Sequence, residues 1–294
     1  MFARLKHALA VPAGILSVAL AAASPAAAAP ALWVVQDEDS TIYLLGTVHV
    51  LKADTQWRSP MIDKALEEAA DLWVEVEADD PAVMQPLVMK YGLDPANPLS
   101  KKISAERFAQ LDAAAKAMGA TGAAFDPMRP WLAGVTLSVA PLLKAGYDPK
   151  SGVEARLKDA AKAAGKPIRT LETPEQQIRF FADLPPAIEM AFLDSALDDA
   201  SESEGMIDAM VTAWLAGDVD ALERLMLDEM KRDYPELYQV LLIGRNQAWA
   251  EQIDTLLDGK GVTVIAVGAA HLAGDDSVQA QLAGRKIEAV RVAD

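Results

Sequence analysis

The 294-residue chain contains no cysteine, which excludes disulfides, thiolate metal ligands and thiol catalysis. Basic residues are few, with 27 lysines and arginines against 43 acidic residues and a formal net charge of −16. Nucleic acid is therefore not expected as a partner, because binding to its phosphates requires a basic surface. Histidine is also scarce, and its three occurrences restrict imidazole chemistry to very few positions.

Several widespread enzyme signatures are missing from the sequence as well. There is no HExxH zinc motif, no GxSxG nucleophile motif, no P-loop and no GxGxxG dinucleotide motif. No repeat of 20–50 residues occurs, and no Gly/Ser-rich or Pro-rich linker divides the chain. We therefore expect residues 29–294 to form a single domain.

Residues 1–28 differ in character from the rest of the chain. Basic Arg4 and Lys6 precede an apolar stretch that ends in small residues around Ala28. This layout predicts a cleaved signal peptide and export to the periplasm. The alternative is a retained membrane anchor, although the apolar part is short for a membrane span. Removing residues 1–28 takes away two basic and no acidic residues, so 25 basic and 43 acidic residues remain and the net charge becomes −18, which favours solubility.

Patterns of apolar residues predict strands mainly at the two ends of the chain and helices between them. Strands are expected at 32–35, 41–45, 71–77, 167–171, 262–267 and 286–292. Helices are expected at 61–70, 104–118, 131–145, 151–164 and 173–182, with several more between 186 and 257. The predicted fold is α/β, with a central mixed sheet formed by N- and C-terminal strands and a large helical insertion.

Three of the expected helices have clear start signals. The first follows Ser59-Pro60. The spacings of Ser151 with Glu154 and of Thr173 with Gln176 each fit a capping box, in which two side chains satisfy the free N–H groups of a helix start. Glu154 is thereby assigned to helix capping, and we expect no other role for it.

Both histidines outside residues 1–28 stand in the same local pattern. His49 ends the motif Gly46-Thr-Val-His, and His271 ends Gly268-Ala-Ala-His, each directly after an apolar strand. Glycine permits a sharp turn at a strand end, so each imidazole is expected at the rim of the sheet. Two such loops on adjacent strands predict two neutral imidazoles on one metal ion. The alternative is two unrelated hydrogen-bonded histidines.

A third metal ligand is expected to be a carboxylate, since two histidines and one acidic group leave an open position for water or substrate. Glu75 is the candidate because it lies in the strand predicted soon after the His49 loop. Alternation places Glu75 and Glu77 on one strand face, and the alternative, which alternation alone favours, is that both are solvated edge charges. Metal-activated hydrolysis also needs a general base, for which Glu77 or Glu172 is available.

Arg245 and Asn246 interrupt a helical pattern that otherwise runs from 238 to 257. An arginine here can clamp a carboxylate or stabilise an oxyanion, whereas the alternative is a surface charge on a buried stem. We count both residues, with Glu75 and Glu172, among the candidate catalytic residues.

The sequence resembles the TraB/GumN family, which includes the Tiki-type metalloproteases, over nearly all of residues 29–294. The resemblance rests on Tyr43–Val50, Asp71–Glu75, Gly165-Lys-Pro with Leu171-Glu-Thr173 and Gln176-Gln177, Arg245-Asn246 with Trp249, and Val267–Gly274. It differs at Gly152-Val153-Glu154, where the family has Gly-Val-Asp.

The resemblance implies an α/β fold of the erythromycin-esterase and ChaN-like group. It also implies a metal site at His49, Glu75 and His271, with Arg245 and Asn246 positioning the substrate or the transition state. Animal members are manganese- or cobalt-dependent proteases, which suits nitrogen and oxygen ligands.

Two functions follow as hypotheses. The first is an exported hydrolase dependent on Mn²⁺, Co²⁺ or Zn²⁺ that acts on a peptide or small molecule, as a metallopeptidase does. The second is a module that binds a peptide, pheromone or metal without turnover. Hydrolysis of the ligand separates the two.

Overall fold

A computed structural model of the protein describes residues 29–199 and 203–292. Its strands form one mixed sheet in the order β4-β3-β5-β2-β1-β6. The strands are β1 (Leu32–Gln36), β2 (Ser40–Thr47), β3 (Asp71–Val74), β4 (Ile168–Thr170), β5 (Gly261–Gly268) and β6 (Val290–Arg291). The predicted α/β class and the joining of both chain ends in one sheet are confirmed. The last strand is shorter than predicted, since only two of its residues pair with β1.

The strand order brings the two GxxH motifs together. Strands β2, β5, β3 and β4 run parallel, whereas β1 and β6 are antiparallel to their neighbours. Strand β5, from the C-terminal part of the chain, lies between β2 and β3. In its register with β2, Gly46 lies opposite Val267 and Thr47 opposite Gly268. Both histidine loops therefore leave the same edge of the sheet from adjacent strands.

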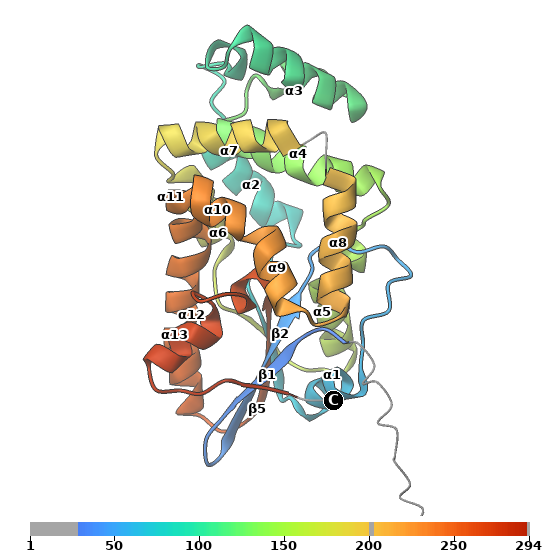
Figure 1. Cartoon of the computed structure of the whole chain (residues 1–294), viewed down its shortest axis with the longest axis vertical. Coiled ribbons are helices and arrows are strands. Elements are labelled where there is room, and N and C mark those ends of the chain that lie inside the picture. Colours follow the sequence, from blue (N-terminus) through green and yellow to red (C-terminus); the bar gives the residue numbers. More distant parts are fainter. Residues whose placement is uncertain (1–28, 200–202, 293–294) are drawn as a thin grey trace, which may run out of the picture.

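Both faces of the sheet are buried, as expected for parallel strands covered by helices. Along β5, Val264 and Ala266 point into one apolar cluster, and Ile265 and Val267 point into another. Helices α1 (Pro60–Glu68) and α5 (Val153–Ala163) contribute to the first cluster. Helices α12 (Gly244–Leu257) and α13 (Val278–Gly284) contribute to the second cluster and lie on the other side of the strands in Figure 1.

The predicted helical insertion lies between β3 and β5. Its further helices are α2 (Pro81–Gly92), α3 (Ala105–Ala117), α4 (Pro130–Lys144), α6 (Pro174–Ala182), α7 (Pro186–Asp199), α8 (Ser203–Leu215), α9 (Val219–Met226), α10 (Asp228–Asp233) and α11 (Pro235–Tyr238). Helix α3 lies at the end of the molecule farthest from the sheet (Figure 1). There it packs on α4 and α7 through a separate apolar cluster that includes Leu111, Leu137 and Leu193.

Two of the three predicted helix starts are confirmed. Ser59 caps α1, and Thr173 with Gln176 forms the full capping box of α6. The capping box predicted for Ser151 and Glu154 is wrong: α5 begins at Val153, its N-cap is Gly152, and no side chain caps it.

The physical reason lies in how closely the start of α5 approaches the first histidine loop. A Cβ atom at Gly152 would stand only 2.1 Å from the carbonyl oxygen of His49, so only glycine fits there. The next N–H, of Val153, donates to the carbonyl of Val48 at 3.0 Å. Backbone contacts with the loop thus replace a side-chain cap, and Glu154 is free for another role.

The helical irregularity near Arg245 lies one turn earlier than predicted. Residues 239–243 form a π-helical turn between α11 and α12, and such turns often accompany functional sites. Arg245 and Asn246 instead belong to the regular first turn of α12. The wider turn precedes them directly.

The predicted signal peptide falls on residues 1–28, outside the described residues. Across the described ranges, no helix combines the length and apolar character required to cross a lipid bilayer.

Candidate functional site

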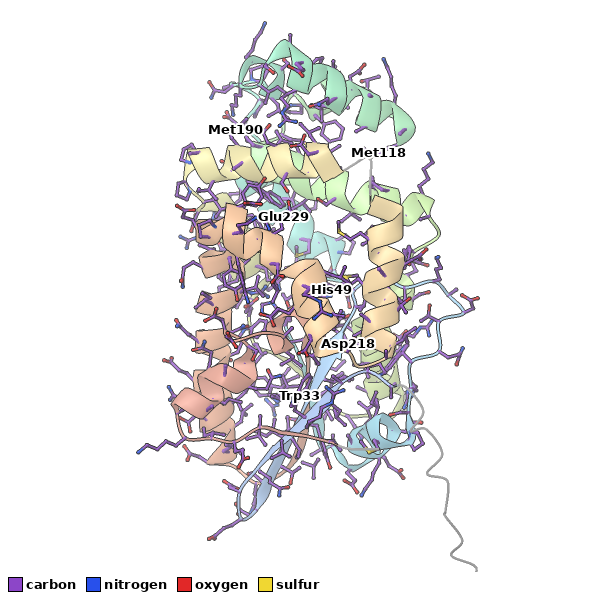
Figure 2. The ribbon with its side chains drawn as sticks, viewed as in Figure 1. Trp33, His49, Met118, Met190, Asp218 and Glu229 are labelled. Atoms are coloured by element: carbon purple, nitrogen blue, oxygen red, sulfur yellow. The ribbon has the colours of Figure 1, made fainter. Side chains whose placement is uncertain are left out.

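Four adjacent parallel strands deliver the candidate residues to one edge of the sheet. His49 follows β2, His271 follows β5, Glu75 follows β3, and Glu172 follows β4. The carboxyl ends of parallel strands are the usual ligand-binding edge of an α/β sheet. Figure 2 shows His49 near the middle of the molecule, between the strands and the helices of the insertion.

Pairing between β3 and β4 continues beyond the regular strands and aligns the two glutamates. The N–H of Glu172 donates to the carbonyl of Glu75 at 2.9 Å. Their side chains are buried, with residue exposures of 6% each. Glu75 lies beyond the last residue of β3, so the local turn, and not strand alternation, sets its direction.

The three candidate metal ligands converge on the backbone of Gly268. A Cβ atom placed on this glycine would lie 3.2 Å from Oε1 of Glu75 and 3.5 Å from Nε2 of His49. It would lie 3.7 Å from Cδ2 of His271, the ring carbon bonded to Nε2. The N–H of Gly268 also donates to Oε1 of Glu75 at 2.7 Å. The second GxxH glycine therefore leaves open the space that the three side chains share.

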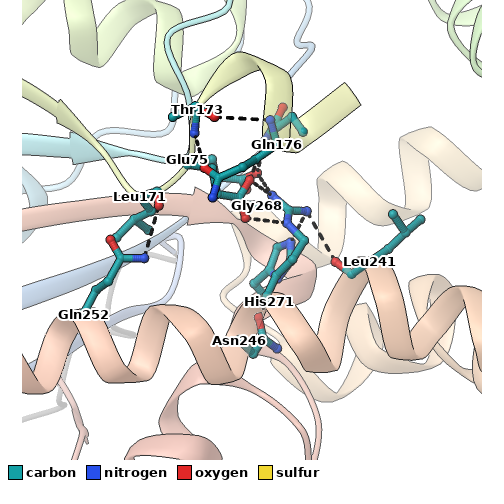
Figure 3. Close-up of polar contacts among 12 residues, drawn as sticks. Glu75, Leu171, Thr173, Gln176, Leu241, Asn246, Gln252, Gly268 and His271 are labelled. Carbon is teal, nitrogen blue, oxygen red and sulfur yellow. Dashed lines mark hydrogen bonds and ion pairs between the residues drawn. The ribbon is translucent and has the colours of Figure 1, made fainter. Parts of the chain in front are cut away.

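Arg245 enters this space from α12 and contacts three of the candidates. Its Nη2 lies 2.6 Å from Oε2 of Glu75, and its Nε lies 2.8 Å from Oε1 of Glu172. Its Nη1 lies 3.1 Å from Nε2 of His271. Gln177 donates from Nε2 to both glutamates, at 3.2 and 3.1 Å. Figure 3 shows the resulting polar network around Glu75, Gly268 and His271.

Asn246 fixes the orientation and the tautomer of His271. The Nδ2 group of Asn246 donates to the carbonyl of Asp276 at 2.8 Å, so its Oδ1 faces Nδ1 of His271 at 2.6 Å. An amide oxygen accepts, and therefore Nδ1 carries the proton and Nε2 presents a lone pair. Burial lowers the pKa of His271 to about 3, so the ring is neutral at neutral pH. The Trp249 ring packs against it, with centroids 4.4 Å apart.

His49 is held in the same way by a different partner. Its Nδ1 lies 2.6 Å from Oε1 of Glu154, which also accepts from Oγ1 of Thr47. The charge of Glu154 raises the pKa of His49 to about 9. Because 66% of the His49 side chain is exposed, water screens this attraction and weakens its effect on stability. The Nε2 atom is left facing the shared space.

Glu75 is ionised despite its burial. Burial alone would raise its pKa, but attraction to protonated His271, Arg245 and His49, with the Gly268 N–H, lowers that pKa to about 2. Since His271 is neutral at neutral pH, Arg245 and His49 supply the positive charge there. Glu75 thus offers an anionic oxygen to whatever occupies the site.

A half-open cavity of about 300 Å³ adjoins the site. Its lining includes His49, Glu75, Glu154, Lys158 and Gln177. Its size and mixed polarity suit a small ligand or a short peptide segment. The chemistry-bearing residues are therefore accessible from solvent through His49.

The structure does not bring every candidate residue into the same role at the site. Glu77 is exposed, and no polar contact joins it to the network within the described residues. Glu172 is present, but Arg245 and Gln177 engage its oxygens. In this position Glu172 acts mainly on Arg245.

The side chains of the site do not form a ready metal centre. In the part of the chain that the structure describes, no group of three or more His, Asp or Glu residues is arranged as a preformed metal cluster. The guanidinium of Arg245 stands between Glu75 and His271 and engages an atom of each.

The chemistry of the donors nevertheless fits a divalent ion. Two imidazole Nε2 atoms and one carboxylate adjoin a single point, and each imidazole has its Nδ1 bonded to an outer oxygen, as in ligated histidines. His49, Glu75 and His271 are the residues that would hold the ion, after Arg245 has released His271 and His49 has lost the proton on its Nε2.

Several residues of the site were missed from the sequence. Glu154, Thr47 and Gln177 contact the candidates directly, Trp249 stacks on His271, and Lys158 lines the cavity. Signals existed for three of them, because Thr47, Gln177 and Trp249 lie in segments that carry the family resemblance, whereas Glu154 stands where the sequence differs from the family. No signal marked Lys158.

The chain is similar to one protein family and to two bacterial proteins. The sequence profile described as the TraB/PrgY/gumN family matches residues 31–291. A protein of Escherichia coli strain K12 called "Uncharacterized protein YbaP" is 26% identical over 256 residues, covering 86% of this chain and 92% of the relative. A protein of the same name from Shigella flexneri is 26% identical over 243 residues, covering 82% and 87%.

No solved structure is found to match the chain. The similarity to the erythromycin-esterase and ChaN-like group therefore stays a prediction.

Proposed function

The chain belongs to the TraB/PrgY/gumN family, and on this premise we propose that it is an exported metal-dependent hydrolase of the peptidase type. His49, Glu75 and His271 hold the metal, which is Mn²⁺, Co²⁺ or Zn²⁺. The substrate is a peptide or a small molecule. The site lies in the periplasm, as the predicted signal peptide at residues 1–28 requires.

One observation carries the proposal. Oε1 of Glu75, Nε2 of His49 and the ring edge of His271 all lie within 3.7 Å of the Cβ position of Gly268. Each imidazole also has its Nδ1 hydrogen-bonded to an outer oxygen, from Glu154 or Asn246. Outer partners of this kind fix the tautomer and the ring direction of metal-binding histidines.

The ion, when bound, supplies Lewis acidity and lowers the pKa of a coordinated water. Two histidines and one carboxylate leave a position for that water or for substrate. Glu75 contributes an anionic oxygen, because its carboxyl stays ionised at neutral pH. Nδ1 of His271 keeps its proton on Asn246, so that Nε2 remains a neutral donor.

Arg245 stabilises negative charge that develops on the substrate. Its guanidinium lies beside both Glu75 and His271, so it faces the reacting position. Glu172 and the face of Trp249, 4.7 Å from the guanidinium carbon, hold it in place. A charged donor fixed before the reaction contributes more than one that must first be ordered.

The proposal is tested by incubating the purified mature protein with a peptide library, with and without each metal, and identifying the products by mass spectrometry. Metal-stimulated cleavage that is lost in His49→Ala and in His271→Ala supports it. Glu77→Ala is the matched control, since Glu77 is exposed and outside the network. Absence of cleavage, or cleavage unaffected by both histidine substitutions, overturns it. Retention of an intact peptide at one per chain would identify a binding module instead.

Export has its own test. The full-length protein, produced in a Gram-negative host, should appear in the periplasmic fraction with an N-terminus near residue 29. Recovery of uncleaved protein in the cytoplasmic fraction would contradict this part of the proposal.

A further inference from the structure

Lys158 is a buried cation in the wall of the cavity. It lies on α5, one helical turn after Glu154, so the two side chains leave the same face of the helix. Only 7% of the Lys158 side chain is exposed. Lysine is almost never buried to this extent without a partner anion. A buried lysine adds nothing to the charge of the surface, and the chain already has a net charge of −16, so solubility does not explain this position.

The partner of Lys158 is placed very differently. Its Nζ contacts Oδ2 of Asp79, whose side chain is 62% exposed. Asp79 belongs to the irregular segment between β3 and α2, while Lys158 is fixed by a regular helix. The carboxylate of Asp79 can therefore turn into water at little cost, whereas the ammonium of Lys158 stays desolvated and requires another anion.

The other charged groups that line the cavity are already engaged. Glu75 is bound to Arg245, and Glu154 is bound to His49. Lys158 is the one Lys or Arg among the described residues that line this cavity. A ligand anion that enters beside Glu75 thus meets the imidazolium of His49, which Glu154 already holds, and one buried ammonium whose present partner is exchangeable.

We propose that Lys158 is an anion subsite that selects substrates carrying a carboxylate close to the bond to be cleaved. The inference rests on the proposed function, since it names the substrate class of the same site. The carboxylate of Asp79 stands where the carboxylate of the substrate binds. A single carboxylate fits better than a phosphate, because phosphate sites gather several donors and this one offers one ammonium. On entry, the substrate carboxylate takes the ammonium and the Asp79 side chain moves to solvent.

Binding is measured calorimetrically on chelator-treated protein, so the result does not depend on turnover. The probes are acetyl-tetra-alanine with a free C-terminal carboxylate, its C-terminal amide, and the amide with one alanine replaced by glutamate. The free acid should bind about tenfold more tightly than the amide, as one charge-assisted contact implies. Tighter binding of the glutamate peptide than of the plain amide would identify a side-chain carboxylate as the source. Equal binding of all three probes, or no binding, overturns the proposal.

Variants assign the preference to the subsite. Lys158→Met keeps most of the apolar stem and should abolish the preference for the acid, whereas Lys158→Arg should retain it. Asp79→Asn removes the competing carboxylate and should strengthen binding of the acid. Lys162→Met is the matched control, an exposed lysine one turn later on α5, and should change nothing. If Lys158 and Asp79 form only a structural ion pair, Lys158→Met and Asp79→Asn lower the melting temperature and leave the preference unchanged, which overturns the proposal.

The experiments distinguish failure of the anion subsite from failure of the proposed function. Acid preference in the chelated protein, without cleavage when metal is restored, supports the subsite and rejects the hydrolase. Metal-dependent cleavage that treats acid and amide alike supports the hydrolase and rejects the subsite.

Discussion

Nη2 of Arg245 lies 2.6 Å from Oε2 of Glu75, and the two side chains are only 11% and 8% exposed. The guanidinium also bonds Glu172, whose side chain is 5% exposed. One cation thus neutralises two buried carboxylates at the ends of adjacent strands. Removal of such a cation leaves two buried carboxylates without the positive charge that contacts both of them.

Arg245→Ala should lower the free energy of unfolding by about 3–5 kcal/mol, because it leaves buried carboxylates without their partner. Denaturant unfolding measures this loss. The control is Arg179→Ala, whose exposed pair with Asp183 on α6 should change stability by less than about 1 kcal/mol. Equal effects of the two substitutions would show that the buried pairing contributes little.

Gly268→Ala tests the shared space directly. The added methyl would lie 3.2 Å from Oε1 of Glu75, which must shift, and 3.5 Å from Nε2 of His49, where it would occupy the space beside the ring. We expect the rate of cleavage of a substrate peptide to fall about 100-fold, because small misplacements of reacting groups have effects of this size. Circular dichroism should show a folded protein. Gly284→Ala, where a Cβ atom meets nothing within 4 Å, is the control and should keep full activity. Full activity of Gly268→Ala would place the reacting centre elsewhere.

Local patterns in the sequence were sufficient to predict much of the site. The paired GxxH motifs predicted the strand ends and the approach of His49 to His271, because glycine after an apolar strand has a strong local meaning. Neither pattern nor spacing showed that β5 inserts between β2 and β3, since strand order depends on long-range pairing.

The role of Glu154 was predicted incorrectly for a related reason. Its spacing from Ser151 fits a capping box, yet the contact of Gly152 with the carbonyl of His49 decides the start of α5. That contact joins segments about 100 residues apart, which a local motif cannot represent. The burial of Lys158 likewise follows from tertiary packing and left no trace in the sequence.

Because residues 49 and 271 are the histidines of residues 29–294, nuclear magnetic resonance can follow each ring separately in protein that lacks residues 1–28. In chelated protein, one ring should titrate near pH 9 and the other should stay neutral down to about pH 3. Glu154→Gln should return the first value toward the ordinary 6.5, because the Glu154 charge is its main cause. Two ordinary titrations near pH 6.5 would contradict the described contacts.

The raised pKa of His49 also determines how the stability of the fold changes with pH. Folded protein holds this proton more tightly than unfolded protein, so the contribution is complete below pH 6.5 and is lost as the pH rises through about 9. The exposed position of the ring limits it to less than about 1 kcal/mol. The difference in unfolding free energy between wild type and Glu154→Gln should therefore shrink above pH 9, as measured in denaturant. A difference in unfolding free energy that grows with pH would contradict this dependence.

Asn246 should control metal affinity without touching the metal. Asn246→Leu removes the acceptor for Nδ1 of His271 and should weaken binding of the metal by about 10–100-fold in calorimetric titration. Asn246→Asp keeps an oxygen acceptor at the same place and should weaken binding less. Unchanged affinity in Asn246→Leu would mean that His271 is not a ligand.

The most direct test of the central claim is elemental analysis of purified protein lacking residues 1–28, after saturation with Mn²⁺, Co²⁺ or Zn²⁺ and removal of loosely bound ions. His49, Glu75 and His271 predict about one tightly held ion per chain, lost in the double variant His49→Ala with His271→Ala and kept in Glu77→Ala. A wild-type protein that retains no ion, or a double variant that retains as much as wild type, would contradict the account.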